Sequence, residues 1–467
     1  MNPLILAIVI AVGLLIVFSP RHKALVAFVV VSLLIPTDQV LVLGGLHFPM
    51  LRLLALFGMA RMVKAKLSSK QAIFSGGLNN LDRVIILLTI FIAIDAVLLF
   101  QEAGAAVYQI GNLYTVFGVY FLLRFLIRDQ KDVERWVRTL TYVVAFVAII
   151  MAIEQATGHN PYAALGGARS SSYADLMERD GRFRATGCFE HPLLAGAFGA
   201  TQIPLFVLLW SRGRKQRLHA AIGLISCTII VVTSNSSTPI LAYAAGIMAL
   251  LLWPLRAWMR TIRWGIVGVL AGLHVVMKAP VWHLIARVDI SGGSSSYHRF
   301  MLVDQCIRHF NDWWLLGVKS TYEWGWDMWD TCNQYVATAE YSGLLPFLLF
   351  IGIFVYGFKY LGGARKATRD RREQYLAWAL GSALFANLVA FWGISYADQI
   401  IVLWYGLLAS VSAVSMAYLR PPNIDANLET DRVRVAATKT NHEQPASIDQ
   451  PIEVYSRVRT SERSIIL

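Results

Sequence analysis

The feature that most limits how this chain can fold is the recurrence of long apolar segments from its first residues to about Tyr418. Apolar segments of about 20 residues cross a bilayer as helices, because a helix satisfies its own backbone hydrogen bonds in lipid. Only 15% of the residues are charged, against about a quarter in soluble domains. We therefore predict an all-α polytopic membrane protein with 12 or 13 transmembrane helices, near 3–18, 24–43, 48–61, 83–100, 111–127, 136–153, 192–210, 218–233, 238–254, 264–280, 336–358, 375–394 and 399–418.

The loops between these segments alternate in their content of Lys and Arg. One alternate set carries most of the basic residues, including the clusters within 61–70, 124–138, 212–217 and 359–372. Because basic loops stay in the cytoplasm, the N-terminus is predicted outside the membrane and the C-terminus inside. The net charge of +13 follows from this topology, so it does not indicate a nucleic-acid partner.

The chain is predicted to form one membrane domain, 1–420, followed by a polar tail, 421–467. The tail has little periodic apolar pattern, so we expect a disordered cytoplasmic segment. Two of the outer loops are long, about 154–191 and 280–335. Long loops in a compact protein are usually functional, and these two are expected to carry the site.

A short polar segment, RFRATGCFEHPLLAG, joins the first outer loop to an apolar helix. It carries Arg182, Arg184 and His191 just before the apolar run that begins at Pro192. Such a segment must lie at the mouth of the bilayer. Fixed arginines there suit a lipid-linked phosphate or diphosphate, because guanidinium groups match phosphate oxygens.

Three segments, taken in order, resemble the O-antigen ligase and O-antigen polymerase superfamily. RATGCFEHPLLAGAF, Arg184 to Phe198, is similar to that family's R-x-x-G-x-F-x-H-P element. YHRFMLVDQCIRHFNDWWLLGVKS, Tyr297 to Ser320, resembles the element that opens its large outer loop. DTCNQYVATAEYSGLLPFLLF, Asp330 to Phe350, resembles the H-N-x-Y-L…E-x-G-L element that closes the loop.

The resemblance implies a multi-pass glycosyltransferase of the bacterial inner membrane, with a GT-C-like fold and a large helical periplasmic loop. Its donor would be a glycan on undecaprenyl diphosphate, and its acceptor another glycan, a lipid A core or a protein hydroxyl. Other polysaccharide-assembly proteins are possible partners. The implied mechanism needs no metal or cofactor, although Asp327 and Asp330 have a spacing that could hold magnesium.

Two departures from the family pattern indicate a divergent, exopolysaccharide polymerase-like branch. Cys332 stands where the family has a histidine before asparagine. The turn between the eighth and ninth predicted spans reads Ser234-Asn235-Ser236-Ser237-Thr238-Pro239, without the arginine often found there.

Arg184 and Arg299 match the family's arginines and are the first candidates for stabilising the leaving diphosphate. Arg182 is a supporting candidate. The alternative for all three is a surface arginine that binds lipid headgroups or structural carboxylates.

The acceptor hydroxyl needs a base or an orienting acceptor, and a neutral thiol at Cys332 would be a poor base. Asp330 and His191 are the candidates, with His298 as a further one and Asn333 as a group that orients a sugar hydroxyl. Each has a structural alternative: Asp330 or Thr331 as a helix N-cap, and His191 as a cap beside Pro192.

Glu340 matches the family's acidic position and is predicted inside the eleventh span, where it would pair with a loop arginine. Arg52 and Asp95 reach a similar depth on neighbouring spans and are predicted to pair. Cys306 and Cys332 both fall outside the membrane, where a disulfide is possible and buried free thiols are the alternative.

Two other function classes remain open. A transporter or flippase of a lipid-linked glycan would explain many spans, but its polar residues would lie at the midplane and not in outer loops. A structural subunit of an envelope assembly system would tolerate replacement of Arg184 and Arg299. The Trp-rich stretch 313–329 fits either sugar stacking or an aromatic belt at the headgroups.

Overall fold

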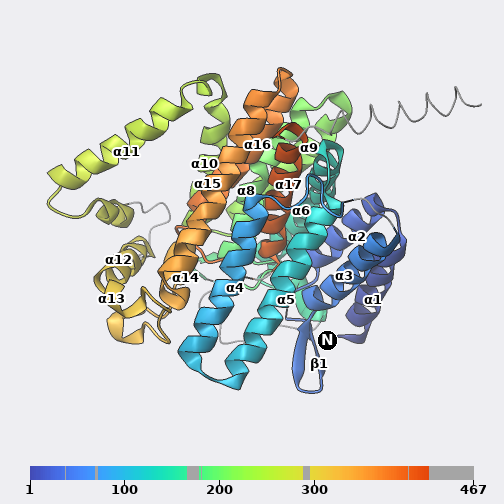
Figure 1. Cartoon of the computed structure of the whole chain (residues 1–467), viewed down its shortest axis with the longest axis horizontal. Helices are drawn as coiled ribbons and strands as arrows, with labels where there is room; N and C mark the ends of the chain where they lie inside the picture. Colours follow the sequence, from blue (N-terminus) through green and yellow to red (C-terminus); the bar gives the residue numbers. More distant parts are fainter. Residues whose placement is uncertain are drawn as a thin grey trace, which may run out of the picture. The chain divides into compact units, whose positions relative to one another are not determined.

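The computed structural model describes residues 1–36, 38–68, 72–165, 178–179, 181–287, 295–397 and 399–419 of the 467 (Figure 1). The predicted disordered tail, 421–467, lies outside the described residues. The helices are α1 Pro3–Phe18, α2 Arg21–Leu34, α3 Met50–Ser68, α4 Asn80–Phe100, α5 Ala103–Leu126, α6 Gln130–Thr157, α8 Pro192–Ser211, α9 Arg214–Thr233, α10 Ser237–Leu251, α11 Met259–Val276, α12 Ser295–Arg308, α13 Phe310–Trp313, α14 Gln334–Ser342, α15 Leu344–Ala367, α16 Arg371–Ala390 and α17 Ile400–Leu419.

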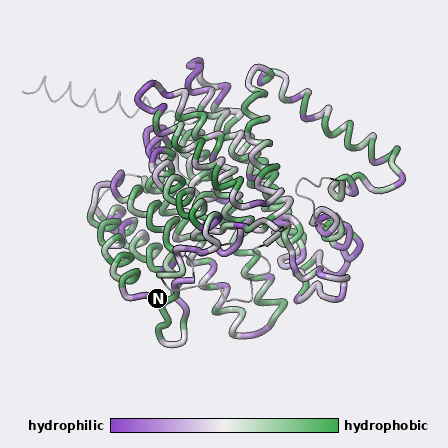
Figure 2. The backbone as a smooth tube through the Cα atoms, turned by 180° about the vertical axis from the view of Figure 1, so that it is seen from behind, coloured by the Kyte–Doolittle hydropathy of each residue, from purple (hydrophilic) through white to green (hydrophobic). Residues whose placement is uncertain are grey.

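Within the described residues, eight helices are long and apolar enough to cross a membrane, which identifies a multi-pass membrane protein. They are α4, α5, α6, α8, α9, α11, α15 and α17. Each of the other predicted spans also contains a helix, and two of these, α1 and α10, are shorter apolar helices. Figure 2 shows hydrophobic residues along the helices and hydrophilic residues gathered at the loops between their ends.

Two predicted spans are interrupted by a break in the structure. The second was predicted over 24–43, but α2 ends at Leu34 and a hairpin of β1, Val40–Leu43, and β2, Leu46–Pro49, follows. Gly44 and Gly45 form its turn at φ 59° and 79°, which glycine adopts without strain. The eleventh span was predicted over 336–358, but the helix breaks at Gly343, so Glu340 lies in α14 before the span.

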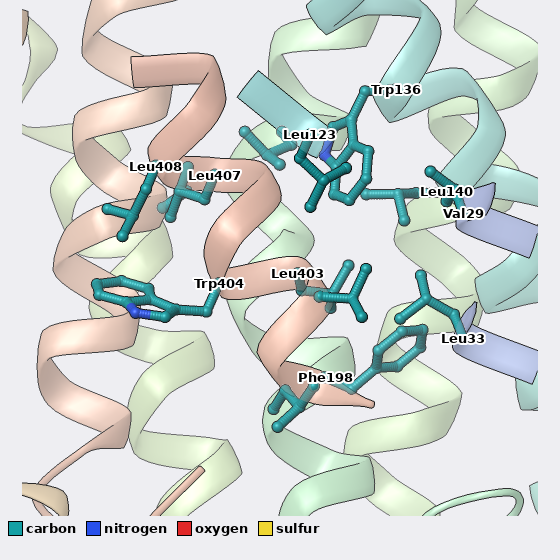
Figure 3. Packing of buried hydrophobic residues seen from close by; sticks show 14 of the residues in the cluster. Val29, Leu33, Leu123, Trp136, Leu140, Phe198, Leu403, Trp404, Leu407 and Leu408 are labelled. Atoms are coloured by element: carbon teal, nitrogen blue, oxygen red, sulfur yellow. The ribbon is translucent and has the colours of Figure 1, made fainter. Parts of the chain in front are cut away.

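The core lies where α17 and α8 pass through the helix bundle, and both are mostly buried. Trp136 of α6 packs on Gly406 of α17, where an added Cβ would meet the indole at 2.3 Å. Figure 3 shows Leu403 of α17 between Trp136 above it and Phe198 of α8 below it, with Trp404 and Leu407 of α17 farther to the left. The bare backbone of Gly406 is therefore what allows the two helices to approach.

A buried ion pair ties α4 to α5. Nε of Arg124 lies 3.0 Å from Oδ1 of Asp82, and both side chains are wholly buried. The Tyr120 hydroxyl donates to the same carboxylate at 2.5 Å, and Arg124 also donates to the carbonyl oxygen of Gly77 at 3.2 Å. The pair thus fixes the start of α4 against the end of α5.

We expect Asp82→Ala to lower the free energy of unfolding by about 3–5 kcal/mol, because it leaves the Arg124 charge buried without its carboxylate. Thermal unfolding of the purified protein in detergent measures the loss. Arg308→Ala is the control, since Arg308 is 69% exposed in its pair with Asp304 and should contribute less than about 1 kcal/mol. Equal melting temperatures for the two variants would contradict the assignment.

The predicted pairing of Arg52 with Asp95 is wrong. Arg52 donates to Oγ1 of Thr115 at 3.1 Å and to the carbonyl oxygen of His47 at 2.8 Å. Its helix, α3, packs against α5, whereas Asp95 lies on α4, which packs against α5 and α15. Similar depth on consecutive helices therefore did not make the two side chains neighbours.

Candidate functional site

The segment Arg184–Cys188 is held in a fixed conformation by a buried carboxylate. Glu154, in the last turn of α6, accepts hydrogen bonds from the backbone N–H of Thr186 at 3.0 Å and of Gly187 at 2.7 Å. It also accepts from the Thr186 hydroxyl at 3.0 Å, and its side chain is almost wholly buried. Three donors on one carboxylate lock this turn, which begins two residues after Arg184.

Other elements bind the same segment from different sides. The Asn160 side-chain amide donates to the carbonyl oxygen of Gly187 at 2.7 Å. Gln399, just before α17, donates to the carbonyl oxygen of Cys188 at 2.8 Å. The backbone N–H of Ala185 donates to the carbonyl oxygen of Thr233 at the end of α9. Arg184 therefore projects from a rigid and buried support.

Arg184 reaches the turn between α9 and α10. Its Nη2 donates to the Ser236 hydroxyl at 2.8 Å, and the guanidinium-bearing residue is only 8% exposed. The Ser236 hydroxyl in turn donates to the carbonyl oxygen of Ser234 at 2.8 Å. Asn235 adopts a left-handed conformation at φ 43°, which gives the turn its shape.

Arg299 reaches the next residue of the same turn. It lies on α12, is 7% exposed, and its Nη1 is 3.5 Å from the Ser237 hydroxyl. The two predicted arginines therefore come from loops far apart in the chain and meet at two adjacent serines. In the sequence, this turn stands out only for its missing arginine.

The loop after α16 supports Arg299 from the other side. Thr238 donates to the carbonyl oxygen of Gly393 at 3.3 Å. A Cβ added to Gly393 would lie 2.2 Å from the Thr238 hydroxyl and 3.1 Å from Nε of Arg299. The absence of a side chain at this position is therefore required for the arginine to lie where it does.

His298 and Cys332 lie beside Arg299. The sulfur of Cys332 is 3.7 Å from Nδ1 of His298, and the other ring nitrogen, Nε2, is 2.9 Å from the carbonyl oxygen of Asp327. Burial raises the pKa of the Cys332 thiol to about 11, although Arg299 acts in the opposite direction. Cys332 is therefore a neutral thiol at physiological pH, as expected for a poor base.

Asp330 lies on the exposed side of this cluster. Partial burial raises the pKa of its carboxyl, His298 lowers it and Asp327 raises it further. Neither Asp330 nor Thr331 is a helix N-cap, which corrects that alternative. The cap of α14 is Asn333, whose Oδ1 accepts from the backbone N–H of Tyr335 at 3.0 Å and of Val336 at 3.2 Å.

Asn333 is wholly buried, and the neighbouring residue anchors the turn to the α16–α17 loop. The backbone N–H of Gln334 donates to the carbonyl oxygen of Phe391, and its side chain accepts from the backbone N–H of Tyr396 at 2.8 Å. Asn333 therefore has a structural role as the cap of α14 as well as a place beside the cluster. Its side-chain amide nitrogen takes no part in the cap.

Glu340 is buried in α14. It forms no ion pair with an arginine of the described loops, so the predicted pairing with a loop arginine is wrong for the part of the chain that the structure describes. Burial raises the pKa of its carboxyl to about 8, and a hydrogen bond with Thr331 partly offsets this. A carboxyl that stays protonated needs no cationic partner, which explains how it is accommodated.

His191 is the N-cap of α8, the structural alternative foreseen for it. Its Nδ1 accepts from the backbone N–H of Leu193 at 3.1 Å. Arg182 lies in the two-residue strand β4, Arg182–Phe183, which pairs with β3, Glu178–Arg179. The side chain of Arg182 is outside the described residues.

All four cysteines are free thiols, so the possible Cys306–Cys332 disulfide is not formed. Cys306 is buried with Trp313 in a small apolar cluster that also includes Leu302 and Val336. Farther out, Trp326 and Trp329 are 90% and 61% exposed, as both a sugar-stacking surface and an interfacial belt would require.

Sequence reasoning missed Glu154, Gly393 and the serine turn. In the sequence, Glu154 marks only the start of an outer loop. An acidic residue in the last turn of an apolar helix nevertheless indicates a structural role, because a buried carboxylate requires hydrogen-bond donors. No protein-family model matches the chain, and no curated protein matches it significantly.

Proposed function

We propose that this chain is a GT-C-like glycosyltransferase of the bacterial inner membrane. It joins glycan units carried on undecaprenyl diphosphate, as a polymerase or ligase of O-antigen or exopolysaccharide. The observation that carries the proposal is the meeting of two buried guanidinium groups, Arg184 and Arg299, at the adjacent hydroxyls of Ser236 and Ser237.

The reaction needs such a pair of cations. The acceptor hydroxyl attacks the anomeric carbon of the donor, and the departing lipid diphosphate gathers negative charge. Preorganised cations that face this charge lower the barrier without having to reorient. The hydroxyls of Ser236 and Ser237 would hold the guanidinium planes fixed beside the diphosphate.

The topology supports a site on the periplasmic side. Both arginines lie on loops poor in Lys and Arg, and the positive-inside rule places such loops outside the cytoplasm. In the family that the chain resembles, glycans are joined on that face of the membrane. Arg184 lies in the segment that leads into the apolar helix α8, and Arg299 lies within α12, so the pair would be close to the membrane surface where a lipid diphosphate would sit.

A reconstituted assay tests the proposal. Purified protein in liposomes is incubated with undecaprenyl diphosphate-linked repeat units, and the lipid-linked glycans are separated by size. A polymerase lengthens the glycan on the lipid, and a ligase transfers it to added lipid A core. A transporter moves the substrate across the membrane without changing glycan length, and this outcome would contradict the proposal.

Gly393→Ala should reduce glycan transfer between about tenfold and 100-fold, because the new methyl group displaces Thr238 and Arg299 by a fraction of an ångström or more. The same liposome assay measures the loss. Gly381→Ala is the matched control, since a Cβ there meets Leu361 at an ordinary 3.8 Å. Equal activity of the two variants would show that the position of Arg299 is not critical.

A further inference from the structure

The imidazole of His298 has a defined tautomer. Its Nε2 lies 2.9 Å from the carbonyl oxygen of Asp327, and a carbonyl oxygen can only accept a hydrogen bond. Nε2 therefore carries the proton. In the neutral ring, Nδ1 is then left with a free lone pair, which is the form that a proton acceptor must have.

The partner of that lone pair is weakly bound. Nδ1 is 3.7 Å from the sulfur of Cys332, whose thiol is neutral. A thiol is a poor hydrogen-bond donor, so a substrate hydroxyl would replace it at little cost. The thiol of Cys332 therefore occupies the position beside Nδ1 where an acceptor hydroxyl could bind.

The ring also lies next to the arginine pair. His298 directly precedes Arg299 on α12, and both side chains interact with Cys332. The charged groups around the imidazole are Arg299 and the carboxylate of Asp330, with Asp327 contributing its carbonyl oxygen. A base at this position would lie beside the arginines that stabilise the departing diphosphate and would face the anomeric carbon.

We propose that His298 is the base that accepts the proton of the acceptor hydroxyl, an inference that rests on the glycosyltransferase function proposed above. Nδ1 takes the proton as the hydroxyl oxygen forms a bond to the anomeric carbon. The bond between that carbon and the diphosphate oxygen breaks, and its electron pair leaves with the lipid diphosphate beside Arg184 and Arg299. The imidazolium then returns the proton to water.

The other two candidate bases, His191 and Asp330, are less suitable in this geometry. The Nδ1 lone pair of His191 is used in capping α8, where it accepts from Leu193. Asp330 lies on the exposed side of the cluster, and its interaction with His298 makes it a group that could stabilise the imidazolium. In that arrangement Asp330 is a positioning residue and His298 the base.

A residue swap across the 3.7 Å contact tests the assignment. His298→Gln should reduce glycan transfer at least roughly 100-fold in the liposome assay, as loss of a general base does. Cys332→Ala removes only the weak partner of Nδ1 and should reduce transfer less than His298→Gln does. The double variant His298→Cys with Cys332→His returns an imidazole to the same place and should recover at least about tenfold over His298→Gln.

His309→Ala is the matched control, because His309 follows α12 and stacks on Trp324 without contact with the cluster. Folded protein is quantified by size-exclusion chromatography so that activities refer to equal amounts. Activity of His298→Gln within threefold of wild type would overturn the assignment, as would a folded swap variant no more active than His298→Gln. Wild-type protein that transfers no glycan would overturn the proposed function as well.

Discussion

Arg299→Ala should reduce glycan transfer roughly 100-fold or more, and Arg184→Ala should do the same. Each substitution removes a buried cation that, in the proposed mechanism, faces the developing charge of the diphosphate. In cells that lack the natural gene, either variant should leave short lipid-linked repeats accumulating and long chains absent, which gel electrophoresis of surface and lipid-linked glycan shows. Loss of transfer to lipid A core with long lipid-linked chains retained would identify a ligase.

Conservative variants separate charge from geometry. Arg184→Lys and Arg299→Lys keep one positive charge but lose the planar fork that binds two oxygens at once. They should therefore recover only part of the activity. Arg308→Ala is the control on the same helix as Arg299, because Arg308 is 69% exposed and pairs only with Asp304 among the described residues. Arg184 and Arg299 variants that behave as Arg308→Ala does would mean that the diphosphate site lies elsewhere.

Glu154→Ala is expected to destabilise the segment that supports Arg184. It leaves the backbone N–H groups of Thr186 and Gly187 and the Thr186 hydroxyl buried without their acceptor. Each such donor costs about 1–3 kcal/mol, so the loss of stability should be about 3 kcal/mol or more. Thermal unfolding in detergent measures this loss, and glycan transfer should fall because Arg184 loses its support.

Glu154→Gln distinguishes the role of the acceptor oxygen from that of the charge. Glutamine keeps one carbonyl oxygen and can still accept from part of the turn, so it should be less destabilising than alanine. Glu134→Ala is a control on the same helix, since Glu134 is partly exposed in its pair with Arg212. A Glu154→Ala protein as stable and active as wild type would show that the carboxylate does not support the arginine segment.

The helices could be predicted from sequence because apolar runs in a membrane protein have few alternatives to a helix. The boundaries were less predictable where apolar character continues through a break. Val40–Leu43 is as apolar as a helix end but forms one strand of a hairpin, because the chain turns at Gly44 and Gly45. Gly343, at φ 82°, likewise divides one apolar run into α14 and α15.

The site was only partly predictable for a different reason. Arg184 and Arg299 could be selected from sequence because the segments around them resemble known motifs, and His298 because it adjoins Arg299. The contacts of these residues with Ser236, Ser237 and Cys332 depend on how distant loops pack. The sequence around each residue does not contain that information. The Arg52–Asp95 prediction failed on the same point, because equal depth does not determine which faces of two helices meet.

The most direct test of the central claim is the binding of undecaprenyl diphosphate to the purified protein. Native mass spectrometry in detergent compares the wild type with the double variant Arg184→Ala, Arg299→Ala and with Arg308→Ala as control. The account predicts that the wild type and Arg308→Ala bind the lipid equally and that the double variant binds it at least roughly 100-fold more weakly. Equal binding by all three proteins would contradict an arginine-bound diphosphate.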